Sequence, residues 1–231
     1  MIATARGRIK PPAVTRKSRL IGAVITAFAV YAALWIGITG DWRWLAAIDD
    51  GSLQLFYDYG ATHPGWVSFW VAVSDVFSPT AMRILALMGI VVALVRRARR
   101  TAVFLTITVM AMGPLTVAAK GLSDRPRPTT ALISETSSSF PSGHALGIMV
   151  SVLAFLTILW PTLPPRMRYP AAILGAAIVF GVGIARVVLN VHHTTDVIAG
   201  WALGLGYYLL CLMLVPPRPG ISGSPNQVLQ R

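Results

Sequence analysis

The sequence predicts an all-α, polytopic membrane protein, and its composition, hydropathy and charge distribution all indicate this class. Of the 231 residues, 55% are hydrophobic and only 12% are charged, and the mean hydropathy is +0.66. Soluble domains carry about a quarter charged residues. A net charge of +12 would suggest a nucleic-acid partner in a soluble protein, but here the bases stand in short clusters between apolar runs. We therefore expect a membrane domain and no nucleic-acid partner.

Six apolar segments approach the roughly 20 residues that a helix needs to cross a bilayer. They cover residues 20–39, 79–95, 101–119, 143–160, 170–189 and 196–215. The first is longer than the core of a signal peptide, about 7–15 residues, and is interpreted as a retained span. The sequence thus predicts six transmembrane helices in a bundle.

The stretch 66–77 is apolar and aromatic, but it is short and contains Ser68, Ser74 and Asp75. If it crossed the membrane, every later segment would reverse its direction. We expect a short interfacial or re-entrant helix near 66–77 instead.

The charged residues divide sharply between the two sides of this arrangement. Fourteen of the 20 basic residues fall on the side of the termini, without any acid, whereas the other six share the opposite side with all eight acids. Basic residues favour the cytoplasmic side. We expect a basic cytoplasmic arm at 1–19, a membrane domain at 20–215, a flexible cytoplasmic tail at 216–231, and a location in the cell membrane.

Three short blocks carry the chemistry, and the predicted helix directions bring all of them to the outer face. They are Lys120-x6-Arg127-Pro128, Pro141-Ser142-Gly143-His144 and Arg186-x5-His192-x3-Asp196. Lys120, Arg127 and Arg186 are cations suited to grip phosphate oxygens, because arginine offers a planar fork and lysine a compact point charge. Arg125 lies outside this spacing and is interpreted as an interfacial residue that extends its charge to water.

The second block begins a predicted helix. Gly143 permits close approach of a ligand to the backbone, and free N–H groups at a helix start attract anions. Ser142 can donate its hydroxyl to an anion or cap the helix. His144 is positioned to donate a proton to a leaving alkoxide.

The third block pairs His192 with Asp196, four residues apart and so on one helical face. A carboxylate there can orient an imidazole that attacks phosphorus and carries a covalent phosphoryl group. The adjacent His193 leaves open which ring faces the anion, although the spacing favours His192. Histidine and carboxylate also bind zinc, but the neighbouring cations would repel a metal, so we expect no metal and no cofactor.

Taken together, the three blocks resemble the signature of the type 2 phosphatidic acid phosphatase superfamily over about residues 100–205. The resemblance implies a metal-independent lipid phosphate phosphatase with six membrane helices and an outward-facing site. It implies His192 as nucleophile, His144 as general acid and Asp196 as orienting partner. It further implies phosphate binding by Lys120, Arg127, Arg186, Ser142 and Gly143. One position departs from the pattern: Ala185 stands where serine is usual, which removes a hydroxyl near the phosphate.

Several functions remain open at this stage. An isoprenoid diphosphate such as undecaprenyl diphosphate is the favoured substrate, and phosphatidate or phosphatidylglycerol phosphate is the alternative. A non-hydrolytic lipid-phosphate binder or transporter would need only the cations, so the histidines and Asp196 argue against it. The related vanadium haloperoxidases are soluble, which six membrane helices disfavour. The sequence indicates no oligomeric state.

Overall fold

The computed structural model describes residues 15–217, and all regular elements among them are helical. In chain order they are α1 (Arg16–Thr39), α2 (Arg43–Gly60), α3 (Pro64–Val76), α4 (Pro79–Val95), α5 (Arg99–Leu105), the π-helical segment η1 (Thr106–Met110), α6 (Met112–Gly121), α7 (Gly143–Leu159), α8 (Pro165–Val188) and α9 (Thr194–Leu214). Most of the expected 1–19 arm and 216–231 tail lies outside the described residues.

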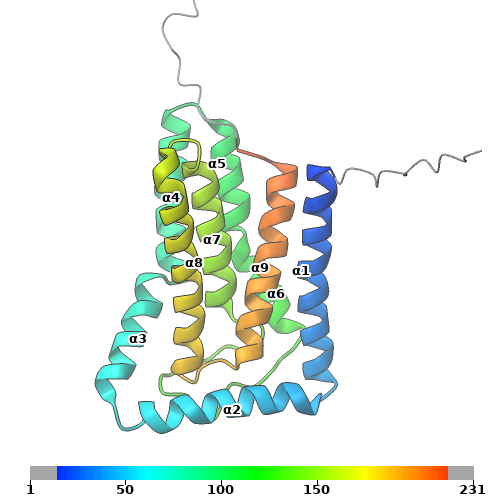
Figure 1. Cartoon of the computed structure of the whole chain (residues 1–231), viewed down its shortest axis with the longest axis vertical. Coiled ribbons are helices and arrows are strands. Elements are labelled where there is room, and N and C mark those ends of the chain that lie inside the picture. The colour runs from blue at the N-terminus through cyan, green and yellow to red at the C-terminus, as the bar shows by residue number, and fades with distance from the viewer. Residues whose placement is uncertain (1–14, 218–231) are drawn as a thin grey trace, which may run out of the picture.

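The long helices run side by side, with α7 packed between α8 and α9 and with α1 along α9 (Figure 1). Small residues let α9 approach α7 closely. A Cβ atom at Gly200 would lie 2.6 Å from the Ser142 carbonyl oxygen, and one at Gly204 would lie 2.9 Å from the Leu146 carbonyl oxygen. Two glycines four residues apart form the small-residue face on which membrane helices pack. This contact holds the start of α7 against the start of α9.

Five helical stretches are long and apolar enough to cross a membrane, and α7 is a shorter apolar helix. Among the five, α3 and α4 form one stretch of 32 residues, Pro64–Val95. Large apolar side chains along α4 are exposed to the surroundings, including Leu87, Val91 and Val95 at 52%, 52% and 78%. Such exposed apolar surface suits contact with lipid tails rather than water. The fold is that of an all-α, multi-pass membrane protein.

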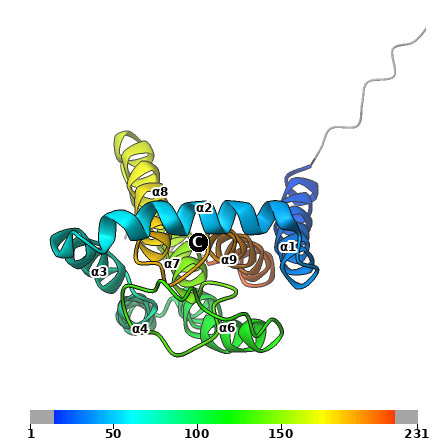
Figure 2. The same ribbon diagram turned by 90° about the horizontal axis from the view of Figure 1, so that it is seen from below.

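The end of the bundle next to α2 differs from the expectation. The helix near 66–77 is present as α3, but it packs along α8 and slopes from the end of α2 to the start of α4, as half of the Pro64–Val95 stretch (Figure 1). The helix that lies across the end of the bundle is α2, which was not predicted (Figure 2). Its buried Leu45, Asp49 and Leu53 are four residues apart and therefore share one face.

The predicted span 101–119 is also interrupted. The π-helical turn η1 separates α5 from α6, and Pro114 follows within the first turn of α6. Proline cannot donate a backbone hydrogen bond and its ring clashes with the carbonyl four residues earlier, here that of Met110. A π turn at this point relieves the clash by shifting the hydrogen-bond pattern.

Helix α1 begins and α9 ends at the end of the molecule opposite to α2 (Figure 1). The motif blocks lie at the other end, where α6 ends and α7 and α9 begin. An irregular segment, residues 122–142, connects α6 to α7 beside α2 (Figure 2). Its backbone is fixed by Leu132 N–H donating to the Leu189 carbonyl at 3.0 Å and Ser139 N–H donating to the Arg125 carbonyl at 2.8 Å.

Candidate active site

The three blocks converge at the end of the bundle covered by α2. Lys120 is in the last turn of α6, His144 is the second residue of α7, and Arg186 is in the last turn of α8. His192 follows in the short connection to α9, and Asp196 is in the first turn of α9. Arg127 and Glu135 come from the connecting segment 122–142.

His192 presents one ring nitrogen to the cations and the other to Asp196. Its Nε2 lies 3.3 Å from Arg127 Nη1, and its Nδ1 lies 3.5 Å from Asp196 Oδ2. Arginine can only donate, so Nε2 carries the lone pair and Nδ1 the hydrogen. Burial lowers the pKa of His192 to about 4, against the influence of Asp196, so the ring is neutral at physiological pH. A neutral imidazole with its lone pair toward the cations has the form that a nucleophile requires.

Asp196 lies at the centre of a hydrogen-bonded cluster. Its Oδ2 accepts from the His193 N–H at 2.9 Å and from the Ser139 hydroxyl, and it lies 3.2 Å from His193 Nδ1. Its distance to His192 is longer than an ordinary hydrogen bond. His193 caps α9 together with Asp196 and lines a second cavity, which His192 does not line. The geometry thus favours His192 over His193 as the ring that meets an anion.

At the start of α7, Ser142 and Gly143 have different surroundings. The Ser142 hydroxyl is buried and caps the helix by accepting from Ala145 N–H at 3.4 Å, so its observed role is the cap. A Cβ atom at Gly143 would lie 3.1 Å from Thr116 and 4.0 Å from Lys120 Cε, so glycine leaves space beside the lysine. His144 lies next to this space and lines the same cavity as His192.

The cations are held mostly by the connecting segment. Lys120 donates to the Ser138 carbonyl. Arg127 donates from Nε to the Ser137 carbonyl at 2.7 Å and from Nη1 to the Val191 carbonyl at 2.6 Å. These carbonyl contacts fix the direction of the two side chains without neutralising their charges, and Arg127 also lies 3.8 Å from Glu135.

Arg186 has a different environment, because an acid lies between it and the cavity. It is 2% exposed, donates to the Ser74 hydroxyl at 2.9 Å, and is ion-paired with Glu135. Glu135 also lies 3.8 Å from Arg127. Burial alone would raise the pKa of the Glu135 carboxyl, but Arg186 and Arg127 hold it below its ordinary value, so the group is ionised. The carboxylate of Glu135 therefore occupies a position suited to an anionic ligand.

Ala185, which stands where the family pattern usually has serine, is fully buried. The hydroxyl that contacts Arg186 comes instead from Ser74 of α3.

Arg125 was interpreted as an interfacial residue, and this interpretation is wrong. Its Nη1 donates to Asp196 Oδ1 at 2.6 Å and to the Thr195 hydroxyl at 2.9 Å, and its Nη2 donates to Asp49 Oδ2 at 2.8 Å. Asp49 in turn accepts from Thr195 N–H at 2.9 Å. Burial disfavours the charge, yet Asp196 and Asp49 together raise the pKa of Arg125. This cluster ties α2 and the connecting segment to the start of α9.

Replacing Arg125 by methionine is expected to destabilise the protein by about 3 kcal/mol, because it leaves Asp49 and Asp196 buried without their cation. Thermal unfolding in detergent should shift downward by several degrees. Arg125→Lys keeps the charge but not the fork that joins both carboxylates, so an intermediate shift is expected. An unchanged midpoint in Arg125→Met would support the interfacial interpretation instead.

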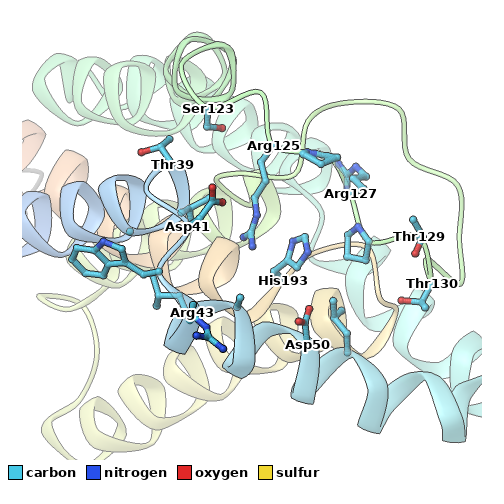
Figure 3. A pocket seen from close by; sticks show the side chains of 18 of the residues that line it. Thr39, Asp41, Arg43, Asp50, Ser123, Arg125, Arg127, Thr129, Thr130 and His193 are labelled. Carbon is cyan, nitrogen blue, oxygen red and sulfur yellow. The ribbon is translucent and has the colours of Figure 1, made fainter.

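Two cavities open beside these residues. One, of about 960 Å³, lies between α4 and α6 and includes five of the eight residues expected in the site: Lys120, Arg127, Gly143, His144 and His192. The other, of about 820 Å³, lies between the end of α1, α2 and the connecting segment, and Arg125 extends toward His193 there (Figure 3). Of the expected residues the second cavity contains Arg127 alone. The first cavity is therefore the candidate active site.

Within residues 15–217, no three histidine, cysteine or acidic side chains lie together as metal ligands would. The donors that converge on the first cavity are cations and imidazoles, and this set suits an anion.

A multi-pass helical bundle with cations and two histidines around one cavity at the helix ends is the architecture of a membrane protein with a candidate anion site. The PAP2 superfamily matches residues 100–219, which include all three blocks, and the chain belongs to this superfamily.

Known relatives agree with that assignment. The chain is 37% identical over 90 residues to phosphatidylglycerophosphatase B of Bacillus subtilis, covering 38% of this chain and 44% of that protein. It is 37% identical over 83 residues to lipid A 1-phosphatase of Rhizobium etli, covering 36% and 32%. The matches thus span less than half the length of these relatives. The fold resembles the crystal structure of a transmembrane PAP2-type phosphatidylglycerolphosphate phosphatase from Bacillus subtilis, with a TM-score of 0.68 and 23% identity over 84% of this chain and 94% of that one.

Proposed function

We propose that this protein is an integral membrane phosphohydrolase that removes phosphate from a lipid phosphate or diphosphate through a phosphohistidine on His192. The observation that carries the proposal is the orientation of the His192 ring. Its Nε2 lies 3.3 Å from Arg127 in the cavity that also contains Lys120 and His144. The other ring nitrogen of His192, Nδ1, lies 3.5 Å from Asp196 Oδ2.

In the proposed reaction, the Nε2 lone pair of His192 attacks phosphorus and the P–O bond to the leaving group breaks. His144, in its imidazolium form, gives its proton to the leaving oxygen and becomes neutral, and Lys120, Arg127 and Arg186 stabilise the charge on the phosphoryl oxygens. His144 then takes a proton from water as that water attacks the phosphohistidine. The P–N bond breaks, inorganic phosphate leaves, and His192 returns to its neutral form.

The positive-inside distribution supports an outward-facing site with cytoplasmic termini. Arg16, Lys17, Arg96 and Arg166 belong to the end of the molecule away from the site, and Asp49 and Glu135 belong to the end that contains it. A cysteine introduced at exposed Thr136 should react with an impermeant thiol reagent in intact cells; protection there would reverse the topology.

The favoured substrate is an isoprenoid diphosphate such as undecaprenyl diphosphate, and the alternative is phosphatidylglycerol phosphate or phosphatidate. The names of the Bacillus subtilis relatives support phosphatidylglycerol phosphate as a second candidate. A non-hydrolytic lipid-phosphate binder would not need a neutral, oriented His192 beside a second histidine.

The test is phosphate release by the purified full-length protein in detergent, with these lipids as separate substrates and with EDTA present. We expect release that EDTA does not reduce. Binding of the lipids without any release would favour the binder, and loss of release with EDTA would contradict a metal-independent reaction.

Replacing Glu135 by glutamine is expected to tighten inorganic phosphate binding by roughly tenfold, because the carboxylate no longer competes for Arg186 and Arg127. The inhibition constant of inorganic phosphate measures this effect. Glu135→Asp, which keeps the charge, should retain most of the competition. Weaker phosphate binding in Glu135→Gln would show that the acid supports the site instead of occupying it.

A further inference from the structure

The cavity that contains His192 has one more cation in its wall, Arg83 of α4. It is the only charged residue in this otherwise apolar helix. A charge within a membrane-spanning stretch is costly and is usually paired or functional. Arg83 lies outside the three sequence blocks, and the proposed reaction does not use it.

Arg83 has no acidic partner among the described residues. The ion pairs of residues 15–217 involve Arg125, Arg127, Arg186 and the two adjacent histidines, but not Arg83. Its Nε is buried without a hydrogen-bond partner. A buried donor without an acceptor is unfavourable, and a guanidinium in that state favours an anionic ligand.

The guanidinium lies against α6, at the position of Gly113. A Cβ atom on Gly113 would be 2.9 Å from Arg83 Nη2, so the absence of a side chain there leaves space for the arginine. Gly113 and Lys120 are two turns apart on the same helix, which separates them by about 10 Å along its axis. Arg83 therefore reaches the cavity at a level further into the bundle than Lys120.

Along the cavity, Lys120 comes first and Arg83 lies further into the bundle. This order matches the order of the phosphates in a lipid that carries two of them. A terminal phosphate held by Lys120 and Arg127 beside His192 would have the rest of the molecule extending further into the cavity. The wall there is apolar, formed in part by Met110, Met112 and Val117. A second phosphate, placed between the terminal phosphate and the tail, would lie on the side of Arg83.

We propose that Arg83 binds the second phosphate of a lipid that carries two phosphates in series. Such a pair is either a direct diphosphate or a terminal phosphate joined through glycerol to a phosphodiester. Arg83 thereby selects these lipids over lipid monophosphates such as phosphatidate. This inference rests on the proposed function for the position of the terminal phosphate, and it narrows the substrate class of the same cavity.

The test compares the binding of non-hydrolysable analogues by the full-length protein in detergent. A prenyl methylenediphosphonate is compared with a prenyl monophosphonate of the same tail. A phosphonate analogue of phosphatidylglycerol phosphate is likewise compared with one of phosphatidate. We expect Arg83→Gln to reduce the preference for the two-phosphate ligand, measured as the ratio of the two Kd values, by about 10- to 100-fold. A fall of the ratio in the prenyl pair would indicate a direct diphosphate. A fall in the phosphatidyl pair would indicate two phosphates joined through glycerol.

Arg83→Lys keeps the charge and should retain most of the preference, which separates charge from packing. An unchanged ratio in Arg83→Gln, or an equal loss for both ligands in each pair, would overturn the assignment. Failure of the proposed function is seen separately: the wild type would bind these analogues but release no phosphate from the corresponding lipids.

Discussion

Replacement of His192 by alanine is expected to reduce kcat by about 10⁴-fold or more, because it removes the group that forms the covalent intermediate. The cations would remain, so the variant should still bind a lipid phosphate. The measurement is phosphate release by variant and wild type in detergent, accompanied by binding of a non-hydrolysable analogue.

The neighbouring histidine provides the matched control. His193 caps α9 and faces the second cavity. His193→Ala is therefore expected to cost an order of magnitude or less in turnover, together with a modest loss of stability of about 1 kcal/mol from the missing cap. If His193→Ala lost more turnover than His192→Ala, the two roles would have to be exchanged.

Replacement of His144 by alanine is expected to lower kcat/KM for a lipid phosphate by about 10²- to 10⁴-fold, the usual contribution of a general acid. The loss should depend on the leaving group. An alkoxide needs a proton as it leaves, whereas p-nitrophenolate leaves readily without one. The measurement compares kcat/KM for a lipid phosphate and for p-nitrophenyl phosphate, because this parameter reports the first chemical step.

A much smaller loss with p-nitrophenyl phosphate would support His144 as the acid. Equal losses for the two substrates would assign His144 to binding or structure, since general-acid catalysis must depend on the leaving group. Thermal unfolding of His144→Ala provides the check that the fold is retained.

The sequence predicted the helical class and the meeting of the three blocks because both follow from local patterns. Apolar runs indicate membrane helices, and helices of alternating direction bring their ends together at one face. The four-residue spacing also predicted that His192 and Asp196 lie close together, and they are 3.5 Å apart, although His192 is in the connection before α9 and not on the helix. The proposed roles of these residues remain predictions for the experiments described above.

The parts that were missed depend on contacts between distant residues. Helix α2 is too polar for the hydropathy of the sequence to predict a membrane span. Asp49 lies between Leu45 and Leu53 on one face of this helix, and this spacing could have indicated a buried acid. Arg125 pairs with Asp49 across 76 positions, and Glu135 meets Arg186 across 51. No spacing rule encodes such pairs, because they arise only when the connecting segment folds over the helix ends.

The central claim, covalent catalysis by His192, is tested most directly by trapping the intermediate. The wild-type protein is mixed with a lipid phosphate labelled in its terminal phosphoryl group, with EDTA present, and quenched with base within one turnover. We predict an acid-labile label that fragmentation of the peptide assigns to His192, and no label in His192→Ala. Turnover without any covalent label, or a label on another residue, would contradict the account.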